Sequence, residues 1–274
     1  MRYLILGSSG QIGSALCEYY FRKDKGVESF DIVENVTQDL RGKNNQILQE
    51  KLDRSDFVFF LAFDVGGSKY LKKYQKSFGF LQNNIQIMEN TFNILRITKK
   101  PFIFASSQMS NMDFSSYGTL KRIGEYYTEA LGGLVVKFWY VYGPEEDFEK
   151  SHVITDFILK AKSSRVIDMI TTGTEARQFL YVEDCCECLD ILSTKYHLLE
   201  KSKPYHISSF QWNTILEVAE EIASYFEGTI IKPSSNTDSV QRSEQREPDE
   251  YILNYWKPKT SLRDGIGKIY SHYV

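Results

Sequence analysis

The sequence lacks the features of a membrane, secreted or nucleic-acid-binding protein. Its longest apolar run, FVFFLAF at 57–63, falls well short of the ~18–20 residues that a membrane helix needs. The N-terminal MRYLILG has neither the apolar core nor the cleavage site of a signal peptide, so we expect a cytoplasmic protein. Lysine and arginine (33) are balanced by aspartate and glutamate (36), whereas nucleic-acid binders usually carry a basic excess. We therefore expect neither a membrane nor a nucleic acid as a partner.

Cysteine is scarce as well. The chain has four, Cys17, Cys185, Cys186 and Cys188, and the last three form a CCxC run within an expected helix. This spacing is not typical of a metal site, and no histidine cluster lies beside it. We expect free thiols in a reducing compartment and no bound metal.

The first half of the chain alternates apolar runs with amphipathic stretches. Strands are predicted at 2–6, 27–31, 57–62, 102–105 and 134–138, and helices between them at 11–22, 82–98 and 117–131. This alternation is typical of βαβ units around a buried parallel sheet. The predicted fold is α/β: a Rossmann-type, doubly wound parallel sheet over 1–145, then a smaller α/β substrate-binding part over 146–274. Segments of the second part are expected to return to the Rossmann core.

The pattern after residue 144 is less regular. We predict helices over 151–163, 183–194 and 213–227, a strand over 166–170 and a polar loop over 232–250. Asn213 or Thr214 would cap the last of these helices, and Gly228 would end it.

A glycine motif follows the first expected strand. Residues 7–13 read GSSGQIG and open a helix. Glycine lets the backbone approach a pyrophosphate, and the helix N-terminus offers N–H donors to it. The motif predicts a dinucleotide-binding turn, the alternative being a glycine-rich turn without a ligand. Its expected cofactor contacts are Gly7, Ser9, Gly10, Gln11, Ile12 and Gly13.

An acidic residue ends the second expected strand. Asp31 lies 24 residues after Gly7, where a carboxylate can bind the ribose hydroxyls of adenosine. It would repel the 2′-phosphate of NADP, and residues 29–36 contain no arginine to bind that phosphate. The sequence therefore favours NAD as the cofactor. The alternative for Asp31 is a solvated strand end.

A Tyr-x-x-x-Lys pair begins the helix expected at 117–131. Tyr117 and Lys121 are four residues apart and lie on one helical face. An ammonium group stabilises a nearby phenolate, so Tyr117 can exchange a proton with an alcohol during hydride transfer. Ser107, just past the preceding strand, can hydrogen-bond the reacting oxygen. Alone, the pair could equally be a surface contact between helical turns.

Together these motifs resemble the extended short-chain dehydrogenase/reductases, the family of sugar-nucleotide epimerases, dehydratases and ketoreductases. The matching segments follow the family's order along essentially the whole chain: GSSGQIG (7–13), Asp31, LAFDVGG (61–67), FASS (104–107), YGTLK (117–121), FWYVYGP (138–144), RQFLYVED (177–184) and YWKPKTSLRDGI (255–266). The resemblance implies an NAD-dependent enzyme with a nucleotide-sugar substrate.

The resemblance also implies roles for single residues. It assigns further cofactor contacts to Asp39, Leu40, Leu61, Ala62 and Phe63, and substrate contacts to Ser107, Asn84, Arg177, Arg242 and Arg246. Arg242 or Arg246 would contact the pyrophosphate, because a guanidinium group binds phosphate through two nitrogens. The alternative for each arginine is a surface charge.

Residues that differ from the family's motifs reduce the number of reaction types that fit this sequence. The 4,6-dehydratases of the family carry an Asp-Glu or Ser-Glu pair directly after the catalytic serine or threonine. Gln108 and Met109 follow Ser107 here, which disfavours dehydration. GDP-fucose synthase has a cysteine in the position of Met109, and a thioether cannot abstract a proton. The segment SHVI at 151–154 nevertheless resembles the one that carries the active-site histidine of GDP-fucose synthase. His152 is therefore a candidate catalytic residue, with a helix cap or surface residue as the alternative.

The remaining chemistry is oxidation and reduction at a sugar hydroxyl. The implied enzyme oxidises C4 of a nucleotide-diphosphate sugar, a GDP-sugar among the candidates, as a 4-dehydrogenase or a 4-epimerase. One alternative is a 4-ketoreductase of a nucleotide keto-sugar. Another is a non-catalytic NAD(H)-binding sensor or scaffold, a class that tends to lose the tyrosine or lysine that Tyr117 and Lys121 supply here.

The resemblance also implies a homodimer, in which two helices pair with their mates in a four-helix bundle. The apolar faces concerned are Ile85, Met88 and Phe92 in 82–98, and Ile123, Tyr127 and Leu131 in 117–131. The alternative is that both faces pack on the chain's own sheet.

Overall fold

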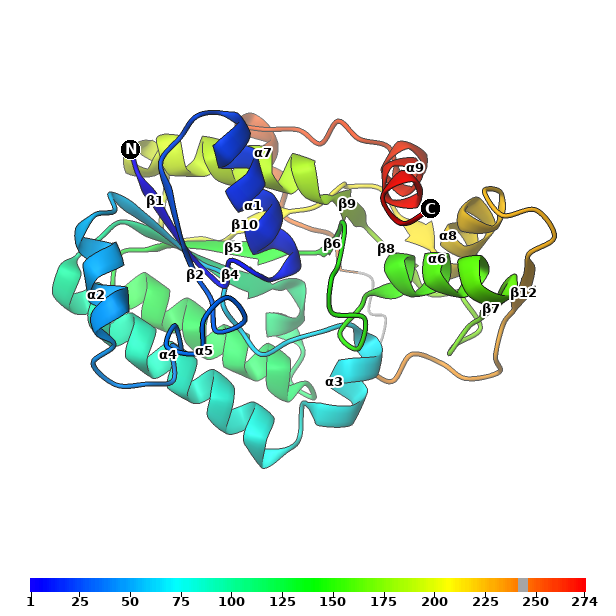
Figure 1. Ribbon diagram of the computed structural model, residues 1–274, viewed down its shortest axis with the longest axis horizontal. Helices are drawn as coiled ribbons and strands as arrows, with labels where there is room; N and C mark the ends of the chain where they lie inside the picture. The colour runs from blue at the N-terminus through cyan, green and yellow to red at the C-terminus, as the bar shows by residue number, and fades with distance from the viewer. Residues whose placement is uncertain (241–245) are drawn as a thin grey trace.

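A six-stranded parallel sheet forms the centre of the larger part of the molecule (Figure 1). The computed structural model describes residues 1–240 and 246–274. The strand order is β10-β5-β4-β3-β1-β2. Its strands are β1 (Tyr3–Leu6), β2 (Val27–Phe30), β3 (Phe57–Phe60), β4 (Phe102–Ser107), β5 (Leu134–Phe138) and β10 (Tyr205–Ile207). Every adjacent pair is parallel, which confirms the predicted Rossmann-type doubly wound sheet.

Helices cover both faces of this sheet (Figure 1). On one face lie α1 (Gln11–Arg22) and α7 (Val182–Thr194), and on the other α2 (Gln46–Asp53), α4 (Phe78–Thr98) and α5 (Ser116–Ala130). The strands serve both layers because successive side chains point to opposite faces. Tyr3 and Ile5 of β1 belong to the core beneath α1, whereas Leu4 and Leu6 belong to the core beneath α4 and α5.

A smaller part beside the sheet is built from the second half of the chain. Its helices are α6 (Val153–Ser164), α8 (Ile215–Ala223) and α9 (Leu262–Tyr273), which pack on one another. Its short strands pair as β7 (Val166–Asp168) with β12 (Ile230–Lys232), β8 (Ala176–Arg177) with β11 (Asn213–Thr214), and β6 (Tyr140–Tyr142) with β9 (Phe179–Tyr181). The short helix α3 (Ser68–Tyr74) and the 3₁₀ turns Gln108–Asn111, Tyr196–Leu198 and Glu250–Asn254 complete the described elements.

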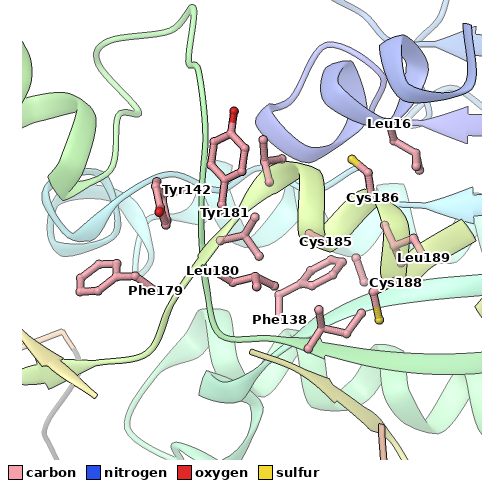
Figure 2. Close-up of a cluster of buried hydrophobic side chains, with 14 of the residues drawn as sticks. Leu16, Phe138, Tyr142, Phe179, Leu180, Tyr181, Cys185, Cys186, Cys188 and Leu189 are labelled. Atoms are coloured by element: carbon pink, nitrogen blue, oxygen red, sulfur yellow. The ribbon is translucent and has the colours of Figure 1, made fainter. Parts of the chain in front are cut away.

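The second half also contributes to the Rossmann core, since β10 pairs with β5 and α7 packs on α1. Cys185, Cys186 and Cys188 of α7 are buried between these helices and the sheet, close to Leu16 and Leu189 (Figure 2). All four cysteines are free. Burial raises the pKa of the Cys185 and Cys188 thiols well above its usual value, so these side chains act as small apolar core residues.

Several local details differ from the sequence prediction. Thr214 caps α8 as predicted, in a capping box with Glu217, but the helix ends at Ala223 rather than near Gly228. The chain tightens there into a turn, in which the N–H of Phe226 donates to the carbonyl of Ala223. The helices α2, α3 and α9 were not predicted. No helix in the described part of the chain is long and apolar enough to cross a membrane.

The glycine motif depends on one close contact. Gly13 in the first turn of α1 lies so near the preceding turn that a Cβ atom would stand 2.0 Å from the carbonyl oxygen of Gly7. No side chain can be accommodated there unless the backbone moves. The packing of α1 against β1 therefore requires glycine at this position.

We expect Gly13→Ala to destabilise the fold by about 1–3 kcal/mol or more, the usual cost of overpacking. Gly79→Ala on α4 is the matched control, because a Cβ there meets nothing within 4 Å. It should be neutral or slightly stabilising. Thermal and denaturant unfolding of both variants measures the difference, and equal midpoints would contradict the close-contact argument.

Candidate active site

One cleft of about 1410 Å³ runs along the carboxyl ends of the sheet strands. This is the edge at which open α/β sheets bind their ligands. The cleft brings together residues that are far apart in the sequence, and its volume exceeds the ~300–1,000 Å³ of a site for one small ligand. All predicted catalytic and cofactor residues line it: Gly7, Ser9, Gly10, Gln11, Ile12, Gly13, Asp31, Asp39, Leu40, Leu61, Ala62, Phe63, Ser107, Tyr117, Lys121 and His152.

The turn after β1 approaches a second backbone segment closely. Gly7 has φ +88°, and a Cβ atom there would lie 2.6 Å from the backbone nitrogen of Ala62. The turn and the segment after β3 therefore meet backbone to backbone. The first turn of α1 contains no acidic residue, and its residues Gln11, Ile12 and Gly13 line the cleft, where the positive end of the helix dipole favours an anion. These features fit a bound dinucleotide.

Asp31 is fixed at the tip of β2. One carboxylate oxygen accepts a hydrogen bond from the N–H of Ser9 (3.0 Å) and the other from the N–H of Val33 (2.9 Å). An ionised carboxylate has further lone pairs, which can accept hydrogen bonds from ribose hydroxyls. The backbone contacts set the orientation of the carboxylate in advance.

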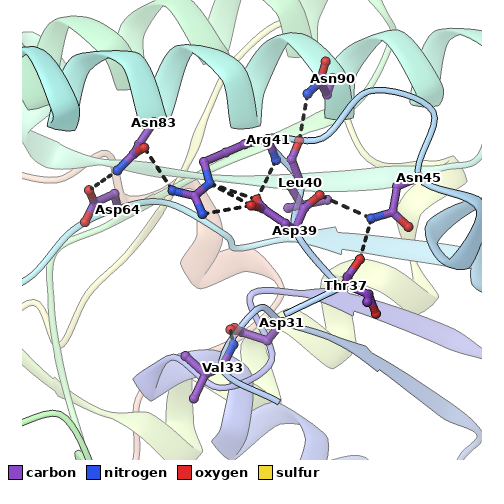
Figure 3. A network of polar contacts seen from close by, with 10 residues as sticks. All are labelled: Asp31, Val33, Thr37, Asp39, Leu40, Arg41, Asn45, Asp64, Asn83 and Asn90. Carbon is purple, nitrogen blue, oxygen red and sulfur yellow. Dashed lines mark hydrogen bonds and ion pairs between the residues drawn. The ribbon is translucent and has the colours of Figure 1, made fainter. Parts of the chain in front are cut away.

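A polar network that the sequence analysis missed lines the same end of the cleft (Figure 3). Arg41 binds both carboxylate oxygens of Asp39, with Nε–Oδ1 and Nη2–Oδ2 distances of 2.9 and 2.8 Å. Its Nη1 donates to Asn83, which in turn donates to Asp64. Residues 29–36 contain no arginine that could bind a 2′-phosphate, but Arg41 also lines the cleft. Asp39 already neutralises that charge, and the hydrogen bonds from Arg41 lower the pKa of Asp39.

Ser107, Tyr117 and Lys121 converge opposite the glycine turn. Ser107 ends β4, and Tyr117 and Lys121 lie in the first two turns of α5, whose N-cap is Ser115. The Lys121 ammonium is almost fully buried, donates to the carbonyl of Ala105 (2.6 Å) and lies 3.8 Å from the centre of the Phe63 ring. It forms no ion pair with any described residue, so its charge is available to a ligand or to Tyr117.

The environment shifts both titrating groups. Burial lowers the pKa of Lys121 to about 7, an effect that the negative charge of Glu125 partly offsets. Burial raises the pKa of Tyr117 to about 12, opposed by a hydrogen bond with Ser107. In the protein without ligand, Tyr117 therefore keeps its proton. A positive charge brought into the cleft would favour the phenolate.

His152 borders the cleft at the start of α6. It occupies the N-cap position, but its side chain makes no capping hydrogen bond. The imidazole Nδ1 instead lies 2.6 Å from a carboxylate oxygen of Glu145, and 41% of the side chain is exposed. Side-chain capping, one alternative for this residue, does not occur.

The two residues after Ser107 supply no acid or base to the cleft. Met109 is buried in the core, and its N–H donates to Ser107 Oγ (3.2 Å). The amide of Gln108 donates to the hydroxyl of Tyr140 (3.3 Å).

Of the predicted substrate contacts other than Ser107, those in the described part of the chain do not line the cleft. Asn84 is fully buried, and its amide bonds both the N–H and the carbonyl of Asp64, so it fixes the segment after β3. Arg177 is buried in an ion pair with Asp238 (2.8 Å). Arg246 donates to the carbonyl of Asn111 (3.3 Å). Arg242 lies outside the described residues.

Comparisons with known proteins agree with this geometry. Residues 3–208 match the NAD dependent epimerase/dehydratase family. GDP-L-fucose synthase of Sinorhizobium fredii is 31% identical over 143 residues, which cover 49% of this chain and 44% of that protein. The chain thus matches less than half the length of that relative. An uncharacterized UDP-glucose epimerase of Bacillus subtilis is 23% identical and matches 97% of this chain and 96% of its own.

Solved structures share the whole fold. UDP-glucose 4-epimerase of Thermotoga maritima superposes with a TM-score of 0.77 at 18% identity, covering 100% of this chain and 98% of its own. ADP-L-glycero-D-manno-heptose-6-epimerase of Helicobacter pylori gives a TM-score of 0.79 at 18% identity, covering 99% and 96%. Since the family match covers well over half of its length, the chain belongs to the NAD dependent epimerase/dehydratase family.

Proposed function

We propose that the protein is an NAD-dependent oxidoreductase acting at C4 of a nucleotide-diphosphate sugar, as a 4-epimerase or a 4-dehydrogenase. The observation that carries the proposal is the convergence of Ser107, Tyr117 and Lys121 on one cleft with the glycine cradle and Asp31. Bound NAD supplies a nicotinamide that accepts a hydride from the sugar carbon or returns one to it.

The chain's own residues handle the proton. Tyr117 takes the proton of the sugar hydroxyl as the hydride leaves the same carbon, and returns it when the ketone is reduced. Ser107 donates a hydrogen bond to the oxygen that changes between hydroxyl and carbonyl. Lys121 stabilises the Tyr117 phenolate and binds the cofactor ribose. Gln108 and Met109 offer no acid or base for eliminating water, which supports redox chemistry without dehydration.

Turnover of a panel of nucleotide sugars tests this proposal, with reduced-nicotinamide absorbance and product NMR as readouts. A new isomer without accumulated NADH identifies an epimerase, and accumulated NADH identifies a dehydrogenase. NADH consumption with keto-sugars alone identifies a ketoreductase. No turnover of any nucleotide sugar, despite NAD binding, would contradict an enzymatic role and favour the sensor or scaffold.

NAD should bind more tightly than NADP. Asp31, held by Ser9 and Val33, accepts ribose hydroxyls and repels a 2′-phosphate, while Asp39 neutralises Arg41. Asp31→Ala should weaken NAD binding by about 1–3 kcal/mol, because it leaves polar groups unpaired. Calorimetric titration with both cofactors measures this. Equal or tighter binding of NADP by the wild-type protein would refute the assignment.

Tyr117→Phe should abolish most turnover while sparing the fold and NAD affinity, because only the hydroxyl is lost. The expected decrease in kcat is roughly 10²–10⁴-fold, the usual contribution of general acid–base catalysis. Lys121→Met should reduce both kcat and NAD affinity, since Lys121 serves both. Steady-state kinetics and NAD titration separate these effects, and near-wild-type turnover by Tyr117→Phe would show that another group moves the proton.

The exposed surface of α4 and α5 supports a homodimer, although through fewer residues than predicted. Met88 and Phe92 are buried in the chain's own core, so their assignment to the paired face was wrong. Ile85, Ile123 and Tyr127 are 49%, 40% and 49% exposed and remain available to a second copy. We propose that these residues form the centre of the dimer interface.

Sedimentation should therefore give a dimer mass at micromolar concentration. Ile123→Glu should shift it toward the monomer, because the charge would be buried in the interface. Ile230→Glu, at a 56% exposed position on β12, is the control and should leave the dimer intact. A monomeric wild-type protein would rule out the interface.

A further inference from the structure

We propose that Glu145 is a positioning residue that holds His152 as the second proton-handling group of the cleft, with imidazole Nε2 as its reactive nitrogen. The inference rests on the proposed function, because it concerns how this chain treats a substrate in that cleft. Glu145 follows β6 and His152 begins α6, so a short loop joins the pair. Neither Tyr117 nor Ser107 takes part in it.

Both carboxylate oxygens of Glu145 contact His152. Oε1 lies 2.6 Å from imidazole Nδ1, and Oε2 accepts the backbone N–H of His152 at 3.0 Å. One carboxylate therefore fixes the position of the backbone and the direction of the ring. A chance contact between an exposed histidine and a glutamate would not be expected to involve both the imidazole ring and the backbone N–H.

The carboxylate is itself held firmly. Its side chain is only 8% exposed, although that of His152 is 41% exposed. Burial raises the pKa of Glu145, but hydrogen bonds from His152 and Thr155 outweigh it and hold the pKa below its usual range. The hydroxyl of Tyr273 on α9 accepts from the N–H of Glu145 (2.6 Å) and donates to its carbonyl (2.9 Å).

These contacts determine the tautomer of the imidazole. An ionised carboxylate can only accept a hydrogen bond, so Nδ1 must carry the proton. The lone pair then lies on Nε2, which no described residue hydrogen-bonds. Nε2 can take a proton from a substrate group that faces it, and Glu145 stabilises the resulting imidazolium until the proton returns. Carboxylates orient histidine bases in this way in other enzymes.

The backbone around the pair is closely packed and leaves no space for a side chain at Gly67. A Cβ on Gly67 would stand 2.3 Å from the carbonyl oxygen of Ser151 and 3.2 Å from the Cα of His152. The N–H of Gly67 donates to the carbonyl of Lys150 (2.9 Å). The loop after β3, which also lines the cofactor end, therefore packs directly against the backbone of the His152 loop. The pair is held close to the segment on which the dinucleotide would lie.

A double-mutant cycle tests the kinetic part. Glu145→Gln keeps the shape of the side chain and removes its charge. We expect kcat to fall by about 10–100-fold, the effect typical of losing a residue that orients an active-site histidine, with little change in KM. In a His152→Asn background the same change should have no further effect. Glu145→Asp should restore part of kcat. The control is Glu227→Gln, the same change at an exposed site, which should leave kcat unchanged. Equal losses in both backgrounds would overturn the proposal.

The tautomer of the His152 imidazole can be measured without any enzymatic turnover. Nitrogen-15 labelling of the four histidines and ¹H–¹⁵N correlation NMR should show the His152 proton on Nδ1 in the wild type, with His152→Asn identifying the signal. Glu145→Gln should weaken or remove that preference. A wild-type proton on Nε2 would overturn the proposal. If no nucleotide sugar is turned over, the proposed function fails while the NMR result still decides whether Glu145 orients His152.

Discussion

The close backbone contact between the turn after β1 and the segment after β3 is the constraint on which the site depends. It requires glycine at position 7, where φ is +88° and a Cβ would strike Ala62. The packing of α1 on the same turn requires glycine at position 13, where a Cβ would strike Gly7. This contact brings the N-terminus of α1 to the same edge of the sheet as Asp31 and Phe63. Asn84 supports it from behind, because its buried amide binds both backbone groups of Asp64. The glycine turn and the candidate catalytic residues Ser107, Tyr117 and Lys121 therefore share one scaffold.

Burial of the Lys121 ammonium group is energetically costly for that scaffold. Burying a charged group without a partner is costly, and the low pKa of Lys121 reflects that cost. A carbonyl oxygen and the face of Phe63 compensate for it only in part. Nearby, Glu125 pairs instead with Lys137 at 3.3 Å and accepts from Ser106 at 2.5 Å. No described residue forms an ion pair with the buried Lys121, which is consistent with a site built to receive a ligand.

Local patterns in the sequence predict much of this structure, because they depend on neighbouring residues. Strand and helix periodicity located five of the six sheet strands and the helices α1, α4 and α5, and the glycine, Tyr117 and Lys121 motifs located the cleft. The sixth strand, β10, is only three residues long and is set by pairing with β5, which is a long-range contact. The sequence does not place Arg41 at the cleft, because its proximity to the cleft follows from the path of the loop after β2. Met88 and Phe92 were misplaced because an apolar helix face does not reveal which apolar partner covers it.

Contacts between the two halves of the chain form the part of the cleft that contains His152, which the glycine and Tyr117–Lys121 motifs do not predict. The ion pair of Lys69 with Asp156 (2.6 Å) joins α3 to α6. The ammonium of Lys150, in the loop before α6, lies 3.5 Å from the carboxylate of Asp64, in the loop after β3. Tyr273 connects the end of the chain to Glu145, and through it to His152. The orientation of His152 is therefore determined by contacts among the smaller part's own elements, whereas Tyr117 and Lys121 are oriented by the sheet. The loop after β3 connects the two sets of contacts, because Phe63 contacts Tyr117 and Lys121 whereas Gly67 packs against the backbone of His152.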